Sequence, residues 1–239
     1  MDCALELEKL ESGYGEVQVL WDVSLKVAAG RLTTIVGANG AGKTTTLRTA
    51  VGSIRPWGGR VRLNGADITR LSPHARARRG LVLVPEGRQL FGALSVQENL
   101  DMGAYCAHAR RQAGEKENLQ RVFQLFPRLL ERRRQKAATL SGGEQQMLAV
   151  ARGLMEQPEV LMIDELSLGL APVVAQQLFL TLKTLKQQGL TIVLVEQNVH
   201  LALALSDYTY VLAQGRVHLE GPSREVAGMD EVRQAYLGL

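Results

Sequence analysis

Short apolar runs alternate with helical stretches along most of the chain. The runs lie at 31–36, 81–84, 160–164 and 191–195, and they are short enough to be buried strands. Strands that alternate with helices are typical of a parallel sheet covered by helices. The pattern therefore predicts an α/β fold built around a mixed or parallel sheet.

Three segments show the strict alternation of apolar and polar positions that marks antiparallel strands. The first thirty residues alternate, which predicts an N-terminal antiparallel β-subdomain. VRLNGADI predicts a hairpin with its turn at Asn64-Gly65, because this pair suits the positive φ angles of a two-residue turn. The segment 207–219 alternates around Gln214-Gly215, and a short helix is expected to close the chain.

The stretch 95–140 is long, polar and rich in helix-forming residues, and it contains few β-branched runs. It predicts a helical subdomain inserted into the sheet domain. We therefore expect a single domain over 1–239, in which 1–94 and 141–239 form the core and 95–140 forms the insertion.

Composition places the chain among soluble globular proteins. It has 239 residues, of which 46% are apolar and 22% are charged, and this suits one large domain. No apolar run approaches the roughly 20 residues needed to span a bilayer. The acidic start of the chain lacks the basic and apolar segments of a secretory signal.

Cysteine and histidine usage indicates neither a disulfide framework nor a metal centre. Cys3 and Cys106 form no CxxC motif, which favours a reducing compartment. The four histidines are scattered, and no pair has metal-ligand spacing. The net charge is +4, and the basic clusters at 74–79 and 131–136 are interpreted as solvated helix faces; no nucleic-acid partner is expected.

The segment GANGAGKT, residues 37–44, fits the phosphate-loop motif and lies between a predicted strand and a predicted helix. Its glycines let successive N–H groups point at phosphate oxygens, and the helix start adds a positive dipole. The motif alone also occurs by chance, but the strand and helix around it favour a nucleotide site. The expected ATP-binding residues are Gly37, Ala38, Asn39, Gly40, Ala41, Gly42, Lys43, Thr44 and Thr45.

An acidic pair follows the apolar run VLMI, and a strand that ends in an acid brings a carboxylate to the sheet edge where ligands bind. Alone this pattern is weak, because many strands end in aspartate. Together with the phosphate loop it predicts that Asp164 holds Mg²⁺ with the Thr44 hydroxyl, and that Glu165 polarises the attacking water.

The segment LSGGEQQ, residues 140–146, places two glycines between a serine and a helix-forming run. One interpretation is a capping box of Ser141 and Glu144. Another is an anion-binding helix start, since capping does not explain two consecutive glycines.

These three motifs together resemble the ATP-binding cassette family, and the resemblance covers nearly the whole chain. It implies that two cassettes enclose two ATP molecules head to tail. The residues Ser141, Gly142, Gly143 and Glu144 would then contact the ATP held by the partner's phosphate loop. One cassette alone should be a poor ATPase.

Two further family positions match. Tyr14 corresponds to the aromatic residue that stacks on adenine, with a plain strand-edge tyrosine as the alternative. Ser167 to Leu170 corresponds to the loop that touches the partner cassette. Leu166 departs from the proline that most cassettes have there, which frees the backbone at the start of this loop.

Two departures from the family pattern narrow the resemblance. Glu86 stands where most cassettes have a glutamine that contacts Mg²⁺. Gln197 replaces the switch histidine beside the γ-phosphate. His200, one helical turn later, is expected to face elsewhere. With SLGLAP and the ending AYLGL, these features resemble the second ATPase subunit of branched-chain amino acid importers. A urea importer is the nearest alternative.

The resemblance implies an ATPase on the cytoplasmic face of the membrane, with Mg²⁺, a second ATPase subunit, two permeases and an extracytoplasmic binding protein as partners. The segment from Pro85 to Leu94 and the inserted helices would receive the permease helices. A soluble cassette acting in DNA repair or translation is a weaker alternative, because such proteins carry two cassettes or a very long insertion. A GTPase or small-molecule kinase is weaker still, because the chain lacks an NKxD motif.

Overall fold

The computed structural model describes residues 2–105, 114–229 and 232. Cys106 and His108 lie outside these residues. Within the described part, no helix is both long enough and apolar enough to cross a membrane.

The amino-terminal part forms a four-stranded antiparallel sheet in the order β2-β1-β4-β5. Its strands are β1 (Cys3–Tyr14), β2 (Val17–Ala28), β4 (Gly58–Leu63) and β5 (Ala66–Asp67). Asn64 and Gly65 both have positive φ angles, 47° and 77°, between β4 and β5. The predicted antiparallel subdomain and its hairpin turn are confirmed.

The second sheet has six strands in the order β10-β9-β3-β8-β7-β6. All neighbours are parallel except β9 and β10, which pair antiparallel across Gln214-Gly215. The sheet is therefore mixed, as predicted. Its strands are β3 (Leu32–Val36), β6 (Leu81–Val84), β7 (Val160–Asp164), β8 (Thr191–Val195), β9 (Tyr208–Ala213) and β10 (Arg216–Pro222).

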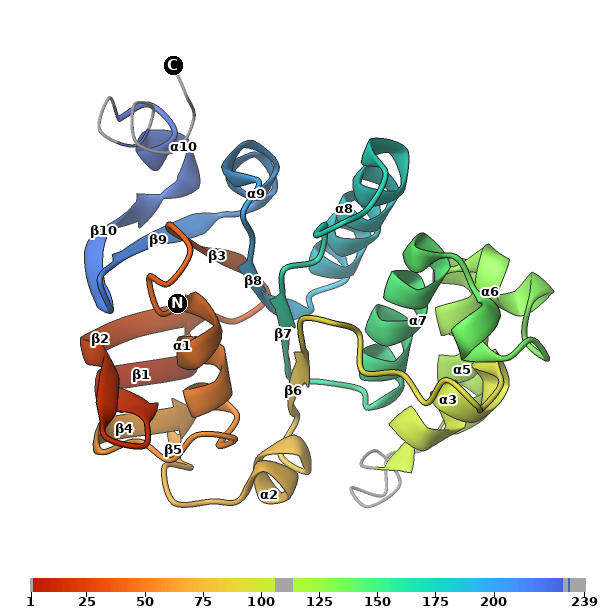
Figure 1. The fold of residues 1–239 in the computed structure, drawn as a ribbon, viewed down its shortest axis with the longest axis horizontal. Coiled ribbons are helices and arrows are strands. Elements are labelled where there is room, and N and C mark those ends of the chain that lie inside the picture. The colour runs from red at the N-terminus through yellow and green to blue at the C-terminus, as the bar shows by residue number, and fades with distance from the viewer. Residues whose placement is uncertain (1, 106–113, 230–231, 233–239) are drawn as a thin grey trace.

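Helices cover both faces of the six-stranded sheet, and a group of helices lies to one side of it (Figure 1). The described helices are α1 (Lys43–Ala50), α2 (Pro73–Ala77), α3 (Val96–Gly103), α5 (Glu115–Leu125), α6 (Pro127–Glu131), the 3₁₀ turn η1 (Ala137–Thr139), α7 (Gly142–Met155), α8 (Pro172–Gln187), α9 (Val199–Leu205) and α10 (Ser223–Val226).

The central strands are buried on both faces, and successive side chains enter different cores. In β7, Val160 and Met162 pack with α1 and the antiparallel sheet, whereas Leu161 and Ile163 pack with α7 and α8. This alternation follows from the two-residue period of a strand. It explains why the buried strands are continuous apolar runs in the sequence.

The helices α3, α5 and α6 come between β6 and α7 in the chain and pack on α7, away from the sheet (Figure 1). Helix α3 begins at Ser95, whose hydroxyl accepts a hydrogen bond from the Glu98 N–H while the Glu98 carboxylate accepts from the Ser95 N–H. The predicted start of the insertion thus coincides with a capped helix start. Its treatment as a separate subdomain over 95–140 stays a prediction.

The basic segment 74–79 differs from the prediction at one residue. Arg76 is 1% exposed, so it is not on a solvated helix face. Its guanidinium donates to the carbonyl oxygens of Thr49, Ala50, Thr69 and Leu71. Arg76 therefore joins α2 to the carboxyl end of α1, where carbonyl groups lack helical partners.

Replacing Arg76 by methionine should lower the free energy of unfolding by about 3 kcal/mol, because buried carbonyl oxygens lose their charged donor. Urea unfolding of the chain measures this loss. Arg78→Ala, an exposed neighbour on the same segment, is the matched control and should change stability by less than about 0.5 kcal/mol. Equal effects of the two substitutions would contradict the structural role of Arg76.

Candidate nucleotide site

The phosphate loop connects the carboxyl end of β3 to α1, as the motif requires. Gly37, Gly40 and Gly42 have positive φ angles of 155°, 79° and 102°. A Cβ at Gly37 would lie 2.2 Å from the Leu212 carbonyl oxygen, so this first glycine is fixed by packing as well as by conformation. The loop is therefore preformed around a concave run of backbone N–H groups.

Lys43 and Thr44 begin α1 and turn toward the loop and the end of β7. The Lys43 Nζ donates to the carbonyl oxygens of Gly37 and Ala38 at 2.8 and 3.1 Å. Burial lowers the pKa of Lys43, opposed by the charges of Glu165 and Asp164. The Thr44 hydroxyl donates to Asp164 Oδ1 at 3.2 Å, which brings the phosphate loop and the acidic strand end together.

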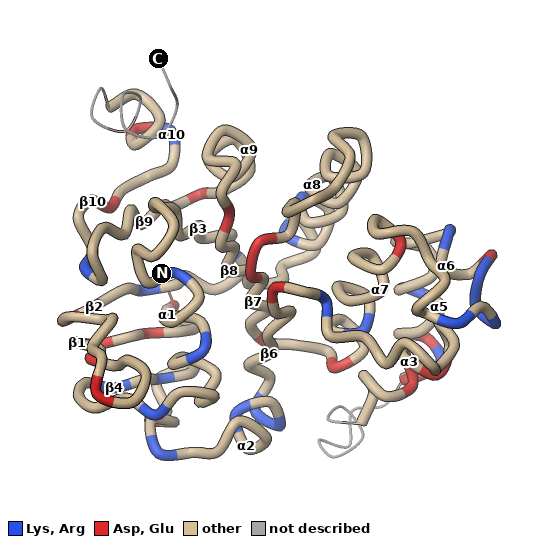
Figure 2. Tube along the Cα trace, viewed as in Figure 1, with Lys and Arg blue, Asp and Glu red and all other residues tan. Residues whose placement is uncertain are grey.

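Asp164 ends β7 as a buried carboxyl, with 2% of its surface exposed. Burial raises its pKa to about 6, the hydrogen bond from Thr44 lowers it, and the nearby Glu165 and Glu86 raise it further. Acidic positions indeed lie close together where β7 and β8 end (Figure 2). The charge of Arg48 lowers the pKa of Asp164 but does not offset burial, so a further cation would stabilise the ionised carboxylate.

Asp164→Asn should stabilise the metal-free and nucleotide-free chain by about 2 kcal/mol at pH 7.5. The pKa of Asp164 is raised on folding from 3.8 to about 6. The protonated Asp164 carboxyl therefore contributes to the stability of the fold below about pH 4, and this contribution is lost as the pH rises through 6. Asparagine removes the charge and keeps an acceptor for Thr44.

Urea unfolding in a chelator at pH 4 and pH 7.5 measures this difference, with Asp22→Asn at an exposed position as the control. The Asp164→Asn chain should have a higher free energy of unfolding than the wild type at pH 7.5 and no such gain at pH 4. A destabilised Asp164→Asn chain at pH 7.5 would contradict the assignment of a buried, uncompensated charge.

Glu165 is held in an unusual backbone conformation directly after β7. Its φ is +51°, in the left-handed region that residues with a side chain rarely adopt. Its N–H donates to the Val195 carbonyl oxygen at 2.9 Å, and its Oε1 accepts from Gln197 Nε2 at 2.8 Å. Glu165, predicted to polarise the attacking water, and Gln197, predicted to act in place of the switch histidine, therefore lie in direct contact.

One cavity of about 490 Å³ joins most of the predicted residues. Tyr14 borders it with 46% of its surface exposed, and the tyrosine hydroxyl accepts from Arg48 at 3.3 Å and lies 3.5 Å from the Thr45 hydroxyl. Glu86 is exposed and borders the same cavity. The cavity is lined by Tyr14, Val19, Asn39, Gly40, Gly42, Lys43, Thr44, Thr45, Glu86, Glu165, Leu168 and Gln197.

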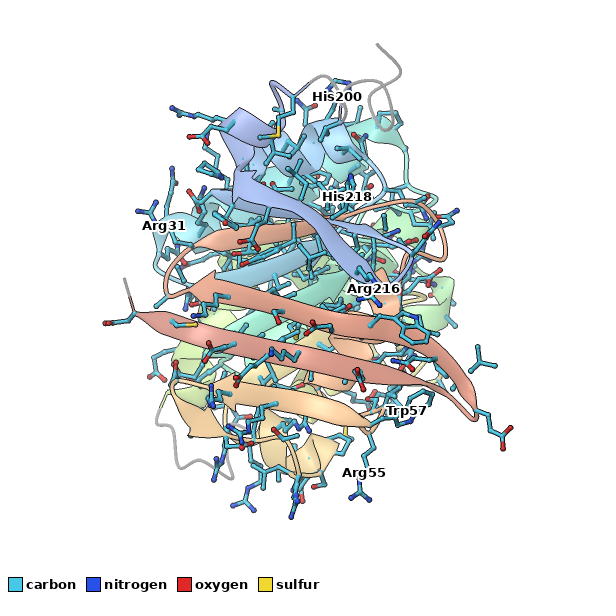
Figure 3. The ribbon with its side chains drawn as sticks, turned by 90° about the vertical axis from the view of Figure 1, so that its left-hand side faces the viewer. Arg31, Arg55, Trp57, His200, Arg216 and His218 are labelled. Atoms are coloured by element: carbon cyan, nitrogen blue, oxygen red, sulfur yellow. The ribbon has the colours of Figure 1, made fainter. Side chains whose placement is uncertain are left out.

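A larger cavity of about 1400 Å³ lies elsewhere, between α9, β9 and α10. Arg31 and His200 line this cavity, and both residues are labelled in Figure 3. No residue of the phosphate loop or of the acidic strand end borders this cavity. The predicted nucleotide-site residues therefore gather at the smaller cavity, whereas His200 lines the larger one, as expected.

Ser141 and Glu144 form the capping box at the start of α7. The Ser141 hydroxyl accepts from the Glu144 N–H at 3.3 Å, and the Glu144 carboxylate accepts from the Ser141 N–H at 2.9 Å. A Cβ at Gly143 would lie 2.6 Å from a Val174 methyl group, so packing on α8 requires this glycine. Gly142 faces the Arg88 guanidinium, and a Cβ added at Gly142 would lie 3.3 Å from the Nη2 atom of Arg88.

None of the four signature residues Ser141 to Glu144 borders the cavity that the phosphate loop lines. Ser141 and Gly142 are exposed instead. The chain thus presents these residues to its surroundings rather than to its own nucleotide site. This placement agrees with a role toward a partner's ATP, which stays a prediction.

Two residues that the sequence analysis did not single out belong to the site's surroundings. Arg88 donates to Gln145 and Gln146 at 2.9 and 3.3 Å, linking the loop after β6 to α7. Glu196, which directly follows β8, is 1% exposed and accepts hydrogen bonds from Ser167. An acid after an apolar strand had already pointed to Asp164, and the same signal could have identified Glu196.

Comparison with known proteins assigns this geometry to a family. Residues 20–167 match the model of the ABC transporter family, a range that includes the phosphate loop, the signature segment and the acidic strand end.

Relatives of similar length match over almost the entire chain. The chain is 43% identical to the high-affinity branched-chain amino acid transport ATP-binding protein BraG of Pseudomonas aeruginosa, over 98% of this chain and 99% of that protein. It is 38% identical to a probable branched-chain amino acid transport ATP-binding protein, LivF, of Archaeoglobus fulgidus, over 98% and 99%. It is 31% identical to the lipopolysaccharide export ATP-binding protein LptB of Escherichia coli, over 98% and 97%.

Solved structures share the fold over the same length. The ADP conformation of MJ1267, an ATP-binding cassette of an ABC transporter, superposes with a TM-score of 0.86 at 27% identity and covers 100% of both chains. A nucleotide-free cassette from an ABC transporter superposes with a TM-score of 0.85 at 26% identity, over 99% of this chain and 100% of that one.

Proposed function

The chain belongs to the ABC transporter family, and from this membership we propose that it powers the import of branched-chain amino acids through separate membrane subunits. The chain is an ATPase of the cassette fold. The observation that carries the choice of solute is the 43% identity to BraG, which spans almost the whole of both chains. The departures at Glu86 and Gln197, which resemble the same subgroup in the sequence, support this choice.

The roles of the site residues follow from their positions around the cavity. The phosphate-loop N–H groups and Lys43 bind the phosphates, for which Lys43 leaves the carbonyl oxygens of Gly37 and Ala38. Tyr14 stacks on the adenine ring at the exposed end of the cavity. Glu165 accepts the proton of the attacking water, and Gln197 holds the Glu165 carboxylate in place.

A magnesium ion fits the residues at the end of β7. The Thr44 hydroxyl and the Asp164 carboxylate lie 3.2 Å apart, and Glu86 borders the same cavity. Oxygen ligands of this kind suit Mg²⁺, and a cation would stabilise the ionised form of Asp164, whose pKa is raised mainly by burial and further by Glu165 and Glu86. When bound with ATP, the ion neutralises charge on the phosphates. In this proposal Thr44, Asp164 and Glu86 hold the ion.

A second cassette completes the site, because Ser141 and Gly142 of the signature segment are exposed while none of its residues borders this chain's own cavity. We expect the partner to be a different ATPase subunit of the same transporter. The segment from Pro85 to Leu94, with its exposed Phe91, and the inserted helices would receive a permease helix, at the cytoplasmic face of the membrane. An extracytoplasmic binding protein delivers the solute.

Solute uptake tests the proposal directly. A strain that lacks this chain should lose high-affinity uptake of radiolabelled leucine, isoleucine and valine, and the wild-type chain should restore it. The Glu165→Gln chain is the matched control and should not restore uptake. Normal leucine uptake with loss of urea uptake in the deletion strain would instead support the urea alternative.

A further inference from the structure

Glu196 is a buried carboxyl group that the proposed hydrolysis does not use. It lies between the end of β8 and the start of α9, with 1% of its surface exposed. Among the described residues, no lysine or arginine forms an ion pair with it. Burying a carboxylate without a cation opposes folding unless hydrogen bonds compensate.

The bonds that compensate come from the loop after Glu165. The Ser167 N–H donates to Glu196 Oε1 at 2.7 Å, and the Ser167 hydroxyl donates to Glu196 Oε2 at 2.8 Å. The Asn198 N–H lies 3.5 Å from the same Oε2. Both carboxylate oxygens thus act as acceptors, and both bind the same serine.

From this arrangement we propose that Glu196 is a positioning residue for ATP hydrolysis, which holds the segment from Glu165 to Leu170 in its active conformation through its two hydrogen bonds to Ser167. The proposal rests on the proposed catalytic role of Glu165. Glu196 touches no reacting atom; it acts through the backbone of the loop.

The loop needs such a restraint for two reasons. Glu165 adopts a left-handed φ of +51°, which is maintained only when the surroundings fix it. The next residue is Leu166, so the chain lacks the ring that would restrict φ at that position. Without the link to Ser167, the backbone around Glu165 would gain conformations in which its carboxylate points away from the water.

The last residue of β8 and the two residues that follow it supply three separate restraints. The Val195 carbonyl oxygen accepts from the Glu165 N–H, Glu196 binds Ser167, and the Gln197 amide donates to the Glu165 carboxylate. Of the two restraints made by side chains, Glu196 is the buried one, whereas Gln197 is exposed. Through Ser167, Glu196 also holds the part of the loop that leads from Glu165 to Leu168 and Gly169, both of which are exposed.

The test uses the full chain in its purified transporter complex and four variants: Glu196→Ala, Glu196→Gln, Ser167→Ala and the double variant Glu196→Ala with Ser167→Ala. For each we measure kcat for ATP hydrolysis, the dissociation constant for ATP and the thermal midpoint of unfolding. Ser206→Ala is the matched control, because this hydroxyl is also partly buried and hydrogen-bonded but lies at the end of α9.

Ser167→Ala should lower kcat about fivefold, as expected for one hydrogen bond, and Glu196→Ala about 20-fold. The double variant should match Glu196→Ala at about 20-fold rather than reach the product of about 100-fold, because both substitutions remove the same link. ATP affinity should stay within about twofold, since neither side chain borders the cavity. Ser206→Ala should keep the wild-type kcat.

Glu196→Gln separates positioning from charge and from folding. Its amide oxygen can accept from the Ser167 N–H while its NH₂ group donates to the Ser167 hydroxyl, so kcat should remain within about threefold of wild type. A kcat in Glu196→Gln as low as in Glu196→Ala would overturn the proposal. So would an independent, multiplicative effect of the two alanine substitutions, or wild-type turnover in Ser167→Ala.

The Glu165→Gln variant distinguishes this inference from the role of Glu165 on which it rests. Wild-type turnover in Glu165→Gln would remove Glu165 from catalysis, and the Glu196 proposal with it. Abolished turnover in Glu165→Gln together with normal turnover in Glu196→Ala would refute the positioning role alone.

Discussion

Replacing Glu165 by glutamine is expected to lower the kcat for ATP hydrolysis by about 1,000-fold and to leave ATP affinity within about twofold of wild type. Glutamine has nearly the same shape as glutamate but cannot accept the proton of the attacking water. The residue lines the cavity beside Gln197, and the phosphate-loop N–H groups that are expected to carry most of the binding are unchanged by this substitution. Phosphate release and nucleotide titration of the assembled complex measure the two effects separately.

Glu159→Gln provides the matched control for this substitution. Glu159 is exposed and precedes β7, whereas Glu165 follows it, so both changes flank the same strand. The control should hydrolyse ATP at the wild-type rate. Unchanged phosphate release in Glu165→Gln would show that another group activates the water.

Replacing Lys43 by alanine should weaken ATP binding by at least about 100-fold, because two charge-assisted contacts to phosphate oxygens are lost. In the structure Lys43 is 5% exposed, and its ammonium group already lies at the phosphate loop, hydrogen-bonded to the carbonyl oxygens of Gly37 and Ala38. The cation is therefore in place before the nucleotide arrives, and little side-chain ordering opposes binding.

Titration calorimetry with ATP measures the loss, and the nucleotide-dependent rise in the thermal midpoint gives a second readout. Lys183→Ala, at an exposed position of α8, removes an equal charge far from the motif and should bind ATP normally. A Lys43→Ala chain that binds ATP like the control would show that the nucleotide occupies another site, such as the larger cavity beside α9.

The strands were predictable because their buried faces leave a direct signal in the chain. The central strands β3, β7 and β8 lie within the predicted runs, and all of their residues are buried. The turns at Asn64-Gly65 and Gln214-Gly215 were predictable because few residue pairs tolerate two consecutive positive φ angles.

The segment around Arg76 shows where sequence patterns fail. A short helix with several arginines has the composition of a solvated surface, and nothing local marks one arginine as buried. Its carbonyl partners at Thr49 and Ala50 lie 27 and 26 residues earlier in the chain. Only the packing of α2 against the end of α1 decides that this guanidinium is enclosed.

The sequence by itself determined the class of fold, the phosphate loop, the acidic strand end and the family. Each of these depends on residues that are close together in the chain, where spacing alone fixes geometry. The phosphate loop is the clearest case, because its glycines and Lys43 act within one turn between a strand and a helix.

The tertiary structure decided which distant side chains meet. Glu165 contacts Gln197 across 32 residues of sequence, and Ser167 contacts Glu196 across 29. These contacts exist because β7 and β8 are adjacent and parallel, so that both strands end at the same edge of the sheet. A local sequence pattern indicates that each strand ends in polar residues. Strand order and register determine which of those residues are hydrogen-bonded to one another.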